Sequence, residues 1–490
     1  MNHAEGILRK ETVLRISATT AAVVGVAMVL ASLLTACGGS GSASTPSTTS
    51  NPTATTAVQV NMGDSPSDWM LGFSMSISSM TLTGSNGSAT VVSASMPMEM
   101  MHLMGTMQPL AMVSAPQGSY TGATVTIGSA TVTYMDPTTK TIAQQTIQGP
   151  MKASVTFPSA VTVNSTPMAM NFDLNLASSV TGTSGNFTMN PNFTMTFGQQ
   201  GSGNAGDYVD GGINEMMGSV SSVSGNSFSM TSLQSAGTFN FATNSSTVFS
   251  GVTTSMGGMT SGMLVLVNAT LQSDGSLMAT EVRSMGASGG MMGGGVITSE
   301  TPTTNPTSLT MVMQNGTGSG MMSSYLSEGA TVNLSSSTTY EMNKDGIDMS
   351  GLRFTPAFDA SHIYVGQSVM PVSSGGMMSG SGGMGGGMMG GMSLAGTITA
   401  SEVVLMPQGI TGTSSSALTS GAVTSFDIAL PSGSAFNSLT GATSVTVYQQ
   451  ANTIMEGGST IASHAAMHAY GLLFYDGSQW DMVALRIGSN

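Results

Sequence analysis

Short runs of alternating apolar and small polar residues recur along most of the chain, separated by clusters of glycine, serine and asparagine. Residues 73–84 (FSMSISSMTLTG), 119–136 (SYTGATVTIGSATVTYMD) and 153–164 (ASVTFPSAVTVN) are three examples. Successive side chains of a β-strand point to opposite faces of a sheet, so this period of two is typical of strands with one buried face. Serine, threonine, glycine and valine also favour strands and turns over helices. We therefore predict an all-β protein built from many short strands.

Residues 97–112 (PMEMMHLMGTMQPLAM) depart from this alternation, and their apolar spacing predicts one buried turn of helix between two prolines. His102 lies here among methionines, which leaves two interpretations open: a mixed methionine and histidine metal site, or a short helix packed against a sheet. We favour packing, because methionine replaces leucine in protein cores at little cost in stability. The methionines concerned are Met98, Met100, Met101, Met104 and Met107.

The first 36 residues have the pattern of an export signal. A basic start precedes an apolar stretch over residues 16–34, and small residues then lead to Cys37. The sequence Leu34-Thr35-Ala36-Cys37 resembles a bacterial lipobox, so we expect removal of residues 1–36 and acylation of Cys37 with fatty acids such as palmitate. A single transmembrane anchor is the alternative, because the apolar run is nearly long enough to span a bilayer.

Cys37 is the only cysteine of the sequence, so the chain forms no internal disulfide and keeps no free thiol once this residue is acylated. Residues 37–57, rich in serine, threonine, glycine and proline, are predicted to be a disordered tether. Several acyl chains hold a protein stably at a membrane. We therefore expect a lipid-anchored protein that faces the periplasm or the cell surface. We favour the outer membrane, because Gly38 gives no inner-membrane retention signal.

Charged side chains are scarce, and most of them are acidic. They make up 7% of the residues, with 9 Lys and Arg against 23 Asp and Glu, which gives a formal net charge of −14. Such a chain has no basic surface with which to neutralise phosphates, so we expect no nucleic-acid partner. The scarcity of titratable groups and the lack of a nucleophile, phosphate-loop or dinucleotide motif argue against an enzyme.

Beyond the tether, strand signals form one long segment and then three similar units. Each unit closes with an apolar strand, a turn and a second strand, as in Ala-Thr-Glu-Val. Asp274-Gly275 and Asp476-Gly477 are typical hairpin-turn residues in the first and third units, and an insertion at 375–392 takes their place in the second. The boundaries that we expect are 58–197 for a β-sandwich, 198–212 for a linker, and 213–286, 296–406 and 408–490 for three β-barrel units.

Two resemblances support this division. The stretches DSPSDWMLGFSMSISSMTLT (64–83), PQGSYTGATVTIGSATVTY (116–134) and MNFDLNLASSV (170–180) resemble an uncharacterised β-sandwich domain of exported bacterial proteins. The three later units resemble a second uncharacterised family, of small β-barrel repeats that close with Ala-x-x-Val or Ala-x-x-Ile strands. Together they cover most of the chain after residue 60. They imply an antiparallel sandwich followed by about three barrel-like units, and they imply no activity and no catalytic residues.

Residues 375–392 (GGMMSGSGGMGGGMMGGM) contain only glycine, methionine and serine. Thioether sulfur is a soft donor that suits copper(I), and flexible glycine lets several sulfurs converge without strain. We favour a loop tip with a methionine-biased composition, and oxidant scavenging by exposed sulfurs is a third interpretation. The candidate copper(I) ligands are Met377, Met378, Met384, Met388, Met389 and Met392, with Met285, Met291 and Met292 in the similar stretch 284–295.

Two further patterns resemble metal sites but are incomplete. His464 and His468 have the spacing of a two-histidine site on a helix, but no glutamate lies between them. Asn343, Asp345 and Asp348 resemble a calcium loop that lacks its terminal glutamate. We favour a surface turn for the two histidines, and we do not favour a calcium site at residues 343–351.

The function that these observations favour is non-catalytic: a cell-envelope lipoprotein that acts as a structural or binding module, with no cofactor and an unidentified protein or glycan ligand. A glycan-binding sandwich would need an exposed aromatic platform, whereas Trp69 and Trp480, the only tryptophans, resemble edge or core residues. The alternative is a periplasmic copper(I)-binding or buffering protein that uses the glycine- and methionine-rich loops.

Overall fold

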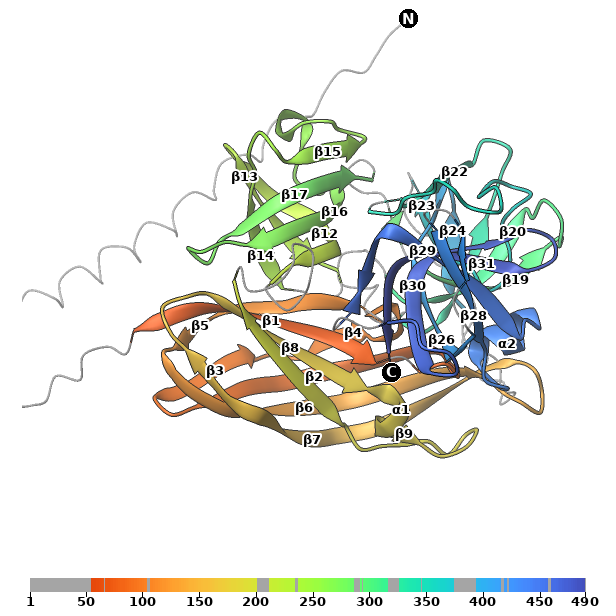
Figure 1. Ribbon diagram of the computed structural model, residues 1–490. Coiled ribbons are helices and arrows are strands. Elements are labelled where there is room, and N and C mark those ends of the chain that lie inside the picture. The colour runs from red at the N-terminus through yellow and green to blue at the C-terminus, as the bar shows by residue number, and fades with distance from the viewer. Residues whose placement is uncertain are drawn as a thin grey trace, which may run out of the picture. The chain divides into compact units, whose positions relative to one another are not determined.

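Strands dominate the regular structure of the computed structural model (Figure 1), which confirms the predicted all-β fold class. The α-helices in the described residues are short: α1, Leu176–Ser179, and α2, Ala435–Thr440. No helix among the described residues has the length and apolar character needed to cross a bilayer. The structure describes residues 54–65, 67–103, 106–200, 211–233, 237–285, 291–292, 294–315, 326–344, 346–373, 394–415, 418–420, 423–456 and 460–489.

Two sheets form a sandwich over residues 55–199. In their order β11-β8-β1-β5, the strands of the first sheet are Phe193–Gln199, Met168–Asn175, Thr55–Ser65 and Met107–Pro116. In the order β3-β2-β6-β7, with β4 beside β2, those of the second are Gly87–Val92, Met70–Gly84, Gly118–Met135, Ile142–Val163 and Met96–Glu99. Neighbouring strands are antiparallel, except that β1 and β8 run parallel. A small ladder of β9 (Val180–Thr181) and β10 (Thr188–Met189) follows α1.

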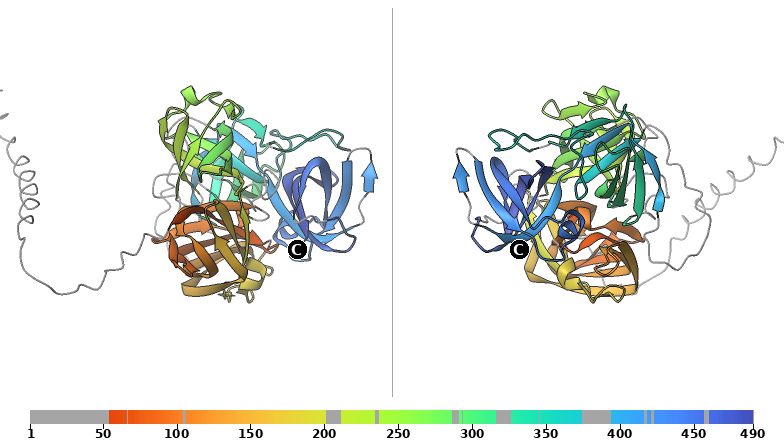
Figure 2. Two further views of the ribbon diagram at one scale, coloured as in Figure 1. Left: turned by 60° about the vertical axis from the view of Figure 1, so that its left-hand side comes forward. Right: turned by 90° about the vertical axis from the view of Figure 1, so that its right-hand side faces the viewer.

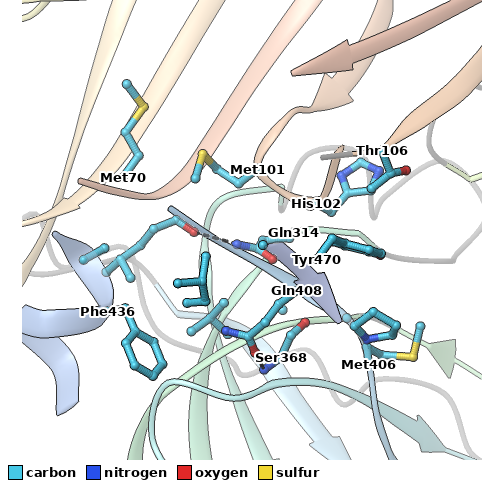
Figure 3. Close-up of a pocket in the computed structure, with 18 of the residues that line it drawn as sticks. Met70, Met101, His102, Thr106, Gln314, Ser368, Met406, Gln408, Phe436 and Tyr470 are labelled. Atoms are coloured by element: carbon cyan, nitrogen blue, oxygen red, sulfur yellow. Dashed lines mark hydrogen bonds between the residues drawn. The ribbon is translucent and has the colours of Figure 1, made fainter. Parts of the chain in front are cut away.

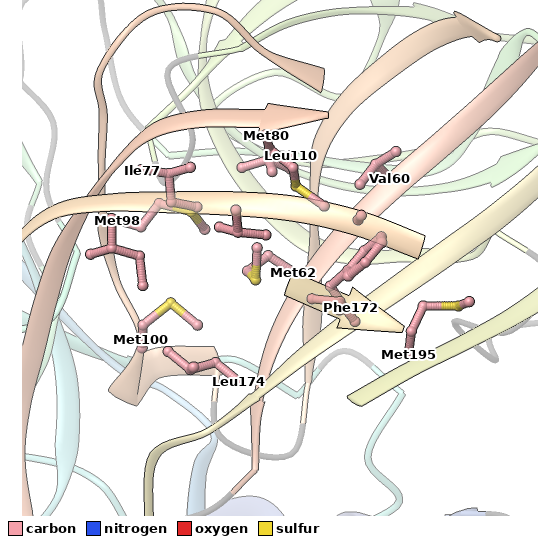
Figure 4. Packing of buried hydrophobic residues seen from close by; sticks show 14 of the residues in the cluster. Val60, Met62, Ile77, Met80, Met98, Met100, Leu110, Phe172, Leu174 and Met195 are labelled. Carbon is pink, nitrogen blue, oxygen red and sulfur yellow. The ribbon is translucent and has the colours of Figure 1, made fainter. Parts of the chain in front are cut away.

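Side chains from both sheets of the sandwich meet in one hydrophobic core. Along β7 the alternation is plain, since Ala153, Val155 and Phe157 are buried and the residues between them are exposed. Methionine supplies much of this core (Figure 4), because its unbranched chain fills irregular gaps between the sheets. The buried methionines are Met62, Met70, Met75, Met80, Met98, Met100, Met101, Met168, Met170 and Met195.

Residues 97–112 form two strand ends around a single 3-10 turn, η1 (Met101–Leu103), in place of the predicted turn of helix. Met98 and Met100 are fully buried in the sandwich core, which confirms the packing interpretation for these two side chains. Met104 lies outside the described residues. His102 is different, because its ring reaches a pocket.

The first barrel sheet covers residues 213–284. In the order β14-β13-β12-β16-β17-β15, its strands are Thr238–Ala242, Ser227–Ser232, Ile213–Ser224, Leu264–Leu271, Leu277–Ser284 and Val248–Gly251. A parallel pair between β14 and β17 closes a ring of strands, and β15 also lies parallel to β17.

The second barrel sheet covers residues 291–405. In the order β22-β25-β23-β19-β20-β21-β24, with β18 beside β23, its strands are Thr339–Met342, Glu402–Leu405, Ser368–Ser373, Gly295–Thr301, Ser308–Met313, Gly329–Asn333, Leu394–Thr399 and Met291–Met292. β24 and β25 are separated only by Ala400 and Ser401, so the chain itself joins the two sides of this sheet. β21 lies parallel to β24, and β22 lies parallel to β25.

The third barrel sheet covers residues 408–489 and forms the blue strands of Figure 2. In the order β26-β30-β31-β29-β28-β27, its strands are Gln408–Ser414, Ala466–Tyr475, Trp480–Ser489, Ser444–Met455, Val423–Ala429 and Leu418–Ser420. A pair between β26 and β28 closes the ring. The long strand β29 lies parallel to β31 over two stretches, on either side of a register shift.

Both predicted Asp-Gly turns join the last two strands of a barrel sheet. Gly275, between β16 and β17, has a φ of 83°, and Gly477, between β30 and β31, has a φ of 95°. Glycine adopts these positive angles without steric cost. The Asp274 and Asp476 carboxylates accept hydrogen bonds from backbone amides two residues further on, at 2.9 and 2.8 Å. The insertion 375–392 lies outside the described residues.

Asp481 on β31 is a buried carboxyl whose ionisation should destabilise the third barrel sheet. Burial raises its pKa to about 6, although the Gln479 side chain donates a hydrogen bond to it; the nearby Asp476 charge acts in the same direction as burial. The unfolded chain releases this proton near pH 4, so stability should fall as the pH rises from about 4 to about 6.

We expect Asp481→Asn to remove this pH dependence. Relative to the native chain, the variant should gain about 1–2 kcal/mol between pH 4 and pH 7.5. The roughly hundredfold change in proton affinity is worth at most about 3 kcal/mol, and screening by solvent reduces it. Urea unfolding followed by the fluorescence of the neighbouring Trp480 measures this gain. The exposed Glu341→Gln variant controls for the loss of one negative charge, and a gain that is the same at both pH values would contradict the prediction.

Candidate functional site

A pocket with a cavity volume of about 110 Å³ lies where the sandwich meets the three barrel sheets (Figure 3). The sandwich contributes Ser67 and Asp68, the start of β2, residues of η1, and Thr106 with the start of β5. The walls are completed by β12 and β16 of the first barrel sheet, by the ends of β19, β20 and β23 of the second, and by β26, α2 and β30 of the third. Segments that lie far apart in the sequence therefore share one cavity.

The His102 ring in this pocket is oriented by Glu99. Its Nδ1 lies 3.2 Å from Glu99 Oε2, which also accepts a hydrogen bond from the His102 backbone amide at 3.1 Å. The other oxygen of this buried carboxylate accepts the Phe73 amide at 2.9 Å, so Glu99 is fixed to β2. Because a carboxylate only accepts hydrogen bonds, Glu99 favours a hydrogen on Nδ1, and in a neutral ring this leaves the Nε2 lone pair available.

Three buried polar atoms on the sandwich side of the pocket have no hydrogen-bond partner among the described residues: Ser67 Oγ, His102 Nε2 and Gln108 Oε1. Ser67 is 1% exposed and Gln108 is 5% exposed. The Gln108 amide is fixed, because its Nε2 donates to the Asn214 carbonyl at 3.1 Å. A buried polar atom without a partner costs about 1–3 kcal/mol, so such atoms around a cavity indicate that something polar binds there.

Side-chain amides hold the walls of the pocket together. Gln314 Nε2 donates to the Leu71 carbonyl at 3.0 Å, which joins the second barrel sheet to the sandwich (Figure 3). Gln408 Nε2 donates to the Gly366 carbonyl at 3.0 Å, which joins the third barrel sheet to the second. These are neutral hydrogen bonds, as expected in a chain with so few charges.

Glu215 on β12 is the charged member of this framework. Its Oε1 accepts a hydrogen bond from Asn343 Nδ2 at 2.6 Å, and its Oε2 accepts one from the Tyr470 hydroxyl at 3.4 Å. One carboxylate of the first barrel sheet thus binds side chains of the second and third. The φ of Glu215 is 52°, a left-handed conformation that is uncommon outside glycine and concentrates at functional sites. Asn268 accepts the Glu215 amide at 2.7 Å and supports this conformation.

The charges around the pocket are negative. Asp68 and Glu215 are among the described residues that line it, and no Lys or Arg is. Burial raises the pKa of Asp68 above its ordinary value. At the end of β1, burial and then the nearby charges of Asp173 and Glu99 raise the pKa of Asp64 well above its ordinary value. When Asp68 and Glu215 are ionised, no Lys or Arg among the described lining residues compensates their negative charge.

The predicted copper(I) ligands at 375–392 lie outside the described residues, so copper(I) binding by this loop stays a prediction. Met285 is buried in a small apolar cluster beside Leu264 and Met370. Only the backbone of Met291 and Met292 is described, as β18. Within the described ranges, no group of three or more His, Cys, Asp or Glu side chains is placed to hold a metal ion.

The two histidines near the C-terminus do not share a helix face. His464 lies in a turn and contacts Ser463, whereas His468 is buried on β30 with its Nε2 2.9 Å from Glu456 Oε2. The predicted surface turn is therefore wrong for His468, because this carboxylate pairs with its ring inside the sheet.

The calcium-like pattern is also divided. Asn343 is fully buried, and its side chain donates a hydrogen bond to Glu215. Asp348 accepts the Ser350 amide at 2.8 Å in an exposed turn. Asp345 and the predicted lipidation site, Cys37, lie outside the described residues.

The two tryptophans lie where we expected them. Trp480 is buried in the core of the third barrel sheet, and Trp69 packs against the sandwich core, with its ring stacked on Phe187 at a centroid distance of 5.0 Å. Neither forms an exposed aromatic platform.

Sequence reasoning does not single out Ser67, Gln108 or Glu215. An isolated polar residue beside a strand resembles a surface residue until distant sheets close over it. One signal exists for His102, since Glu99 precedes it by three residues, a spacing at which a carboxylate reaches the ring across a tight turn.

We expect Glu215→Ala to destabilise the chain by about 2–4 kcal/mol, because it leaves the buried Asn343 amide and Tyr470 hydroxyl without this acceptor. Glu341→Ala is the matched control. It removes an exposed carboxylate that pairs with Arg283 in the same region, and should cost less than about 1 kcal/mol. Urea unfolding of the native chain and both variants measures the difference, and equal costs would contradict the structural role of Glu215.

Residues 217–283 match the model of a protein family described as a domain of unknown function (DUF5666). The match lies inside the first barrel sheet, within the unit that resembles an uncharacterised family of small barrels, and contributes Met217 and Leu266 to the pocket. A comparison with curated proteins found no match to the chain. The family match covers a minor part of the chain, so it concerns this segment and brings no activity with it.

Proposed function

We propose that this protein is a non-catalytic binding module and that the pocket between the sandwich and the barrel sheets holds a small ligand. The observation that carries the proposal is that three lining residues from the sandwich, Ser67, His102 and Gln108, each have a buried polar atom without a partner among the described residues. A pocket that combines apolar walls with fixed polar groups is typical of small-molecule recognition.

The geometry of Ser67 and His102 supports binding over catalysis. Both residues line the pocket, and a serine nucleophile activated by histidine is normally hydrogen-bonded to it. Here neither Ser67 Oγ nor His102 Nε2 has a partner among the described residues, so the two are not hydrogen-bonded to each other. Ser67 Oγ and His102 Nε2 can therefore each form a hydrogen bond with a ligand.

The size of the cavity is compatible with a ligand larger than a single water molecule. One water needs about 10–15 Å³ of such space, and the cavity offers about 110 Å³. The framework of side-chain amides and Glu215 fixes the walls in advance, which reduces the entropy lost on binding.

We further propose that the three barrel sheets are copies of one domain. In each, the last strand segment lies parallel to two earlier segments, as β17 does to β14 and β15. The pairs β21–β24 and β22–β25 repeat this scheme in the second sheet, and the two stretches of β29 repeat it in the third. The family match over residues 217–283 supports this for the first sheet. Three copies of one domain, together with the sandwich, then form the walls of one pocket.

A binding screen tests the proposed pocket. The full chain, purified in a nonionic detergent, is titrated with a panel of small neutral, cationic and anionic compounds and followed by ligand-observed NMR. We expect at least one compound to bind saturably, and its affinity to fall about fivefold in Ser67→Ala, which removes one hydrogen-bonding group. The control is Ser222→Ala, an exposed serine on β12. No binder in the panel, or equal binding to both variants, would overturn the proposal.

We also propose that acylated Cys37 anchors the protein to a bacterial membrane, as the lipobox pattern suggests. Cell fractionation tests this. The native chain should sediment with membranes and dissolve in detergent, whereas Cys37→Ser should remain soluble or keep its leader. Ser40→Ala, close by in the tether, should behave like the native chain. A fully processed Cys37→Ser chain that still sediments with membranes would contradict lipid anchoring.

A further inference from the structure

We infer that the pocket selects a small organic cation that donates hydrogen bonds, namely a protonated amine that carries a short alkyl group. This inference rests on the proposed binding function and names the class of ligand. Three features of the pocket carry it: the character of its unpaired atoms, the sign of its charges and the apolar side chains that gather on one side.

The unpaired atoms are mostly acceptors. Gln108 Oε1 can only accept, and the amide cannot turn round, because Nε2 is held by the Asn214 carbonyl. His102 Nε2 accepts in the neutral ring, because Glu99 holds the hydrogen on Nδ1. The Ser67 hydroxyl can accept as well as donate. A ligand that satisfies these atoms must therefore supply donors, and an ammonium group supplies three.

The charges favour a cation. Asp68 and Glu215 line the pocket, and Glu99 lies directly behind the His102 ring. No Lys or Arg is among the described residues of the lining, so a bound anion would meet repulsion without compensation. A cation beside Asp68 would in turn favour the ionised form of this buried carboxyl.

Apolar side chains gather on one side of the pocket. Figure 3 shows Met70, Met101 and Phe436 there, and His102, Thr106 and Tyr470 on the other side together with Met406. A ligand with its ammonium group toward His102 can extend an alkyl chain toward these apolar side chains. A metal ion would fit less well, since the described residues hold no group of three His, Cys, Asp or Glu ligands.

Three matched compounds test the inference on the full chain by calorimetric titration at pH 7.5: n-butylammonium, 1-butanol and butyrate. They share a four-carbon chain and differ in the polar end. We expect saturable binding of butylammonium at one site, at least about tenfold weaker binding of butanol and no binding of butyrate.

Variants separate the contribution of charge from that of shape. Asp68→Asn keeps the size of the side chain and should weaken butylammonium binding about tenfold while leaving butanol binding unchanged. Asp348→Asn, in an exposed turn, is the matched control and should leave both affinities unchanged.

Butanol or butyrate binding as tightly as butylammonium, no binding of butylammonium, or an unchanged amine affinity in Asp68→Asn would each overturn the inference. If another compound of the screening panel still binds in a manner sensitive to Ser67→Ala, the proposed binding function stands and only the ligand class is wrong. If no compound of either set binds, both fail.

Discussion

The carboxylate of Glu215 is the interaction on which the arrangement around the pocket depends. This charged group joins the first barrel sheet to both of the others, through Asn343 and Tyr470. A half-buried carboxylate is stabilised by hydrogen bonds, and here the donors come from two other sheets. The assembly of the three sheets therefore supplies hydrogen bonds to this group.

Neutral side-chain amides near Glu215 also join different sheets, and each of their hydrogen bonds is weaker than one to a charged group. Gln108, Gln314 and Gln408 each donate to a backbone carbonyl of another sheet. Backbone carbonyls at strand ends need donors, and a glutamine side chain can reach one across an interface without bringing a charge. A chain with 7% charged residues thus joins its sheets mainly by uncharged hydrogen bonds. The sandwich core, in contrast, consists of apolar side chains, many of them methionine.

Local patterns in the sequence predict the strands, the two Asp-Gly turns and the methionine core. Each depends on neighbours within a few residues: alternation along 153–164, an aspartate beside a glycine at 274–275, or a thioether in a strand. The parallel pairs that close the barrel sheets depend on strands far apart in the chain, and no local pattern reports them. The same holds for the pocket. Ser67 and Gln108 acquire their importance only when β12, β20 and β26 come to lie beside the sandwich.

Residues around the pocket depart from the usual preferences for backbone conformation and for hydrogen bonding of buried atoms. Glu215 has a backbone conformation that a non-glycine residue seldom adopts, and Ser67, His102 and Gln108 keep buried polar atoms without partners. A fold selected for stability alone would remove both features, since each is unfavourable by itself. Their presence around one cavity is why we assign the pocket, rather than the outer faces of the sheets, as the site of binding.

Nitrogen-15 NMR of the imidazole rings tests this assignment most directly, because the sequence has only 5 histidines and His102→Gln identifies the signal. The account predicts that the free chain carries its His102 hydrogen on Nδ1, with Nε2 unprotonated, and that a bound ligand shifts the Nε2 resonance as it donates a hydrogen bond. A His102 ring protonated at Nε2 in the neutral form, or an Nε2 resonance that stays unchanged at saturating ligand, would contradict it.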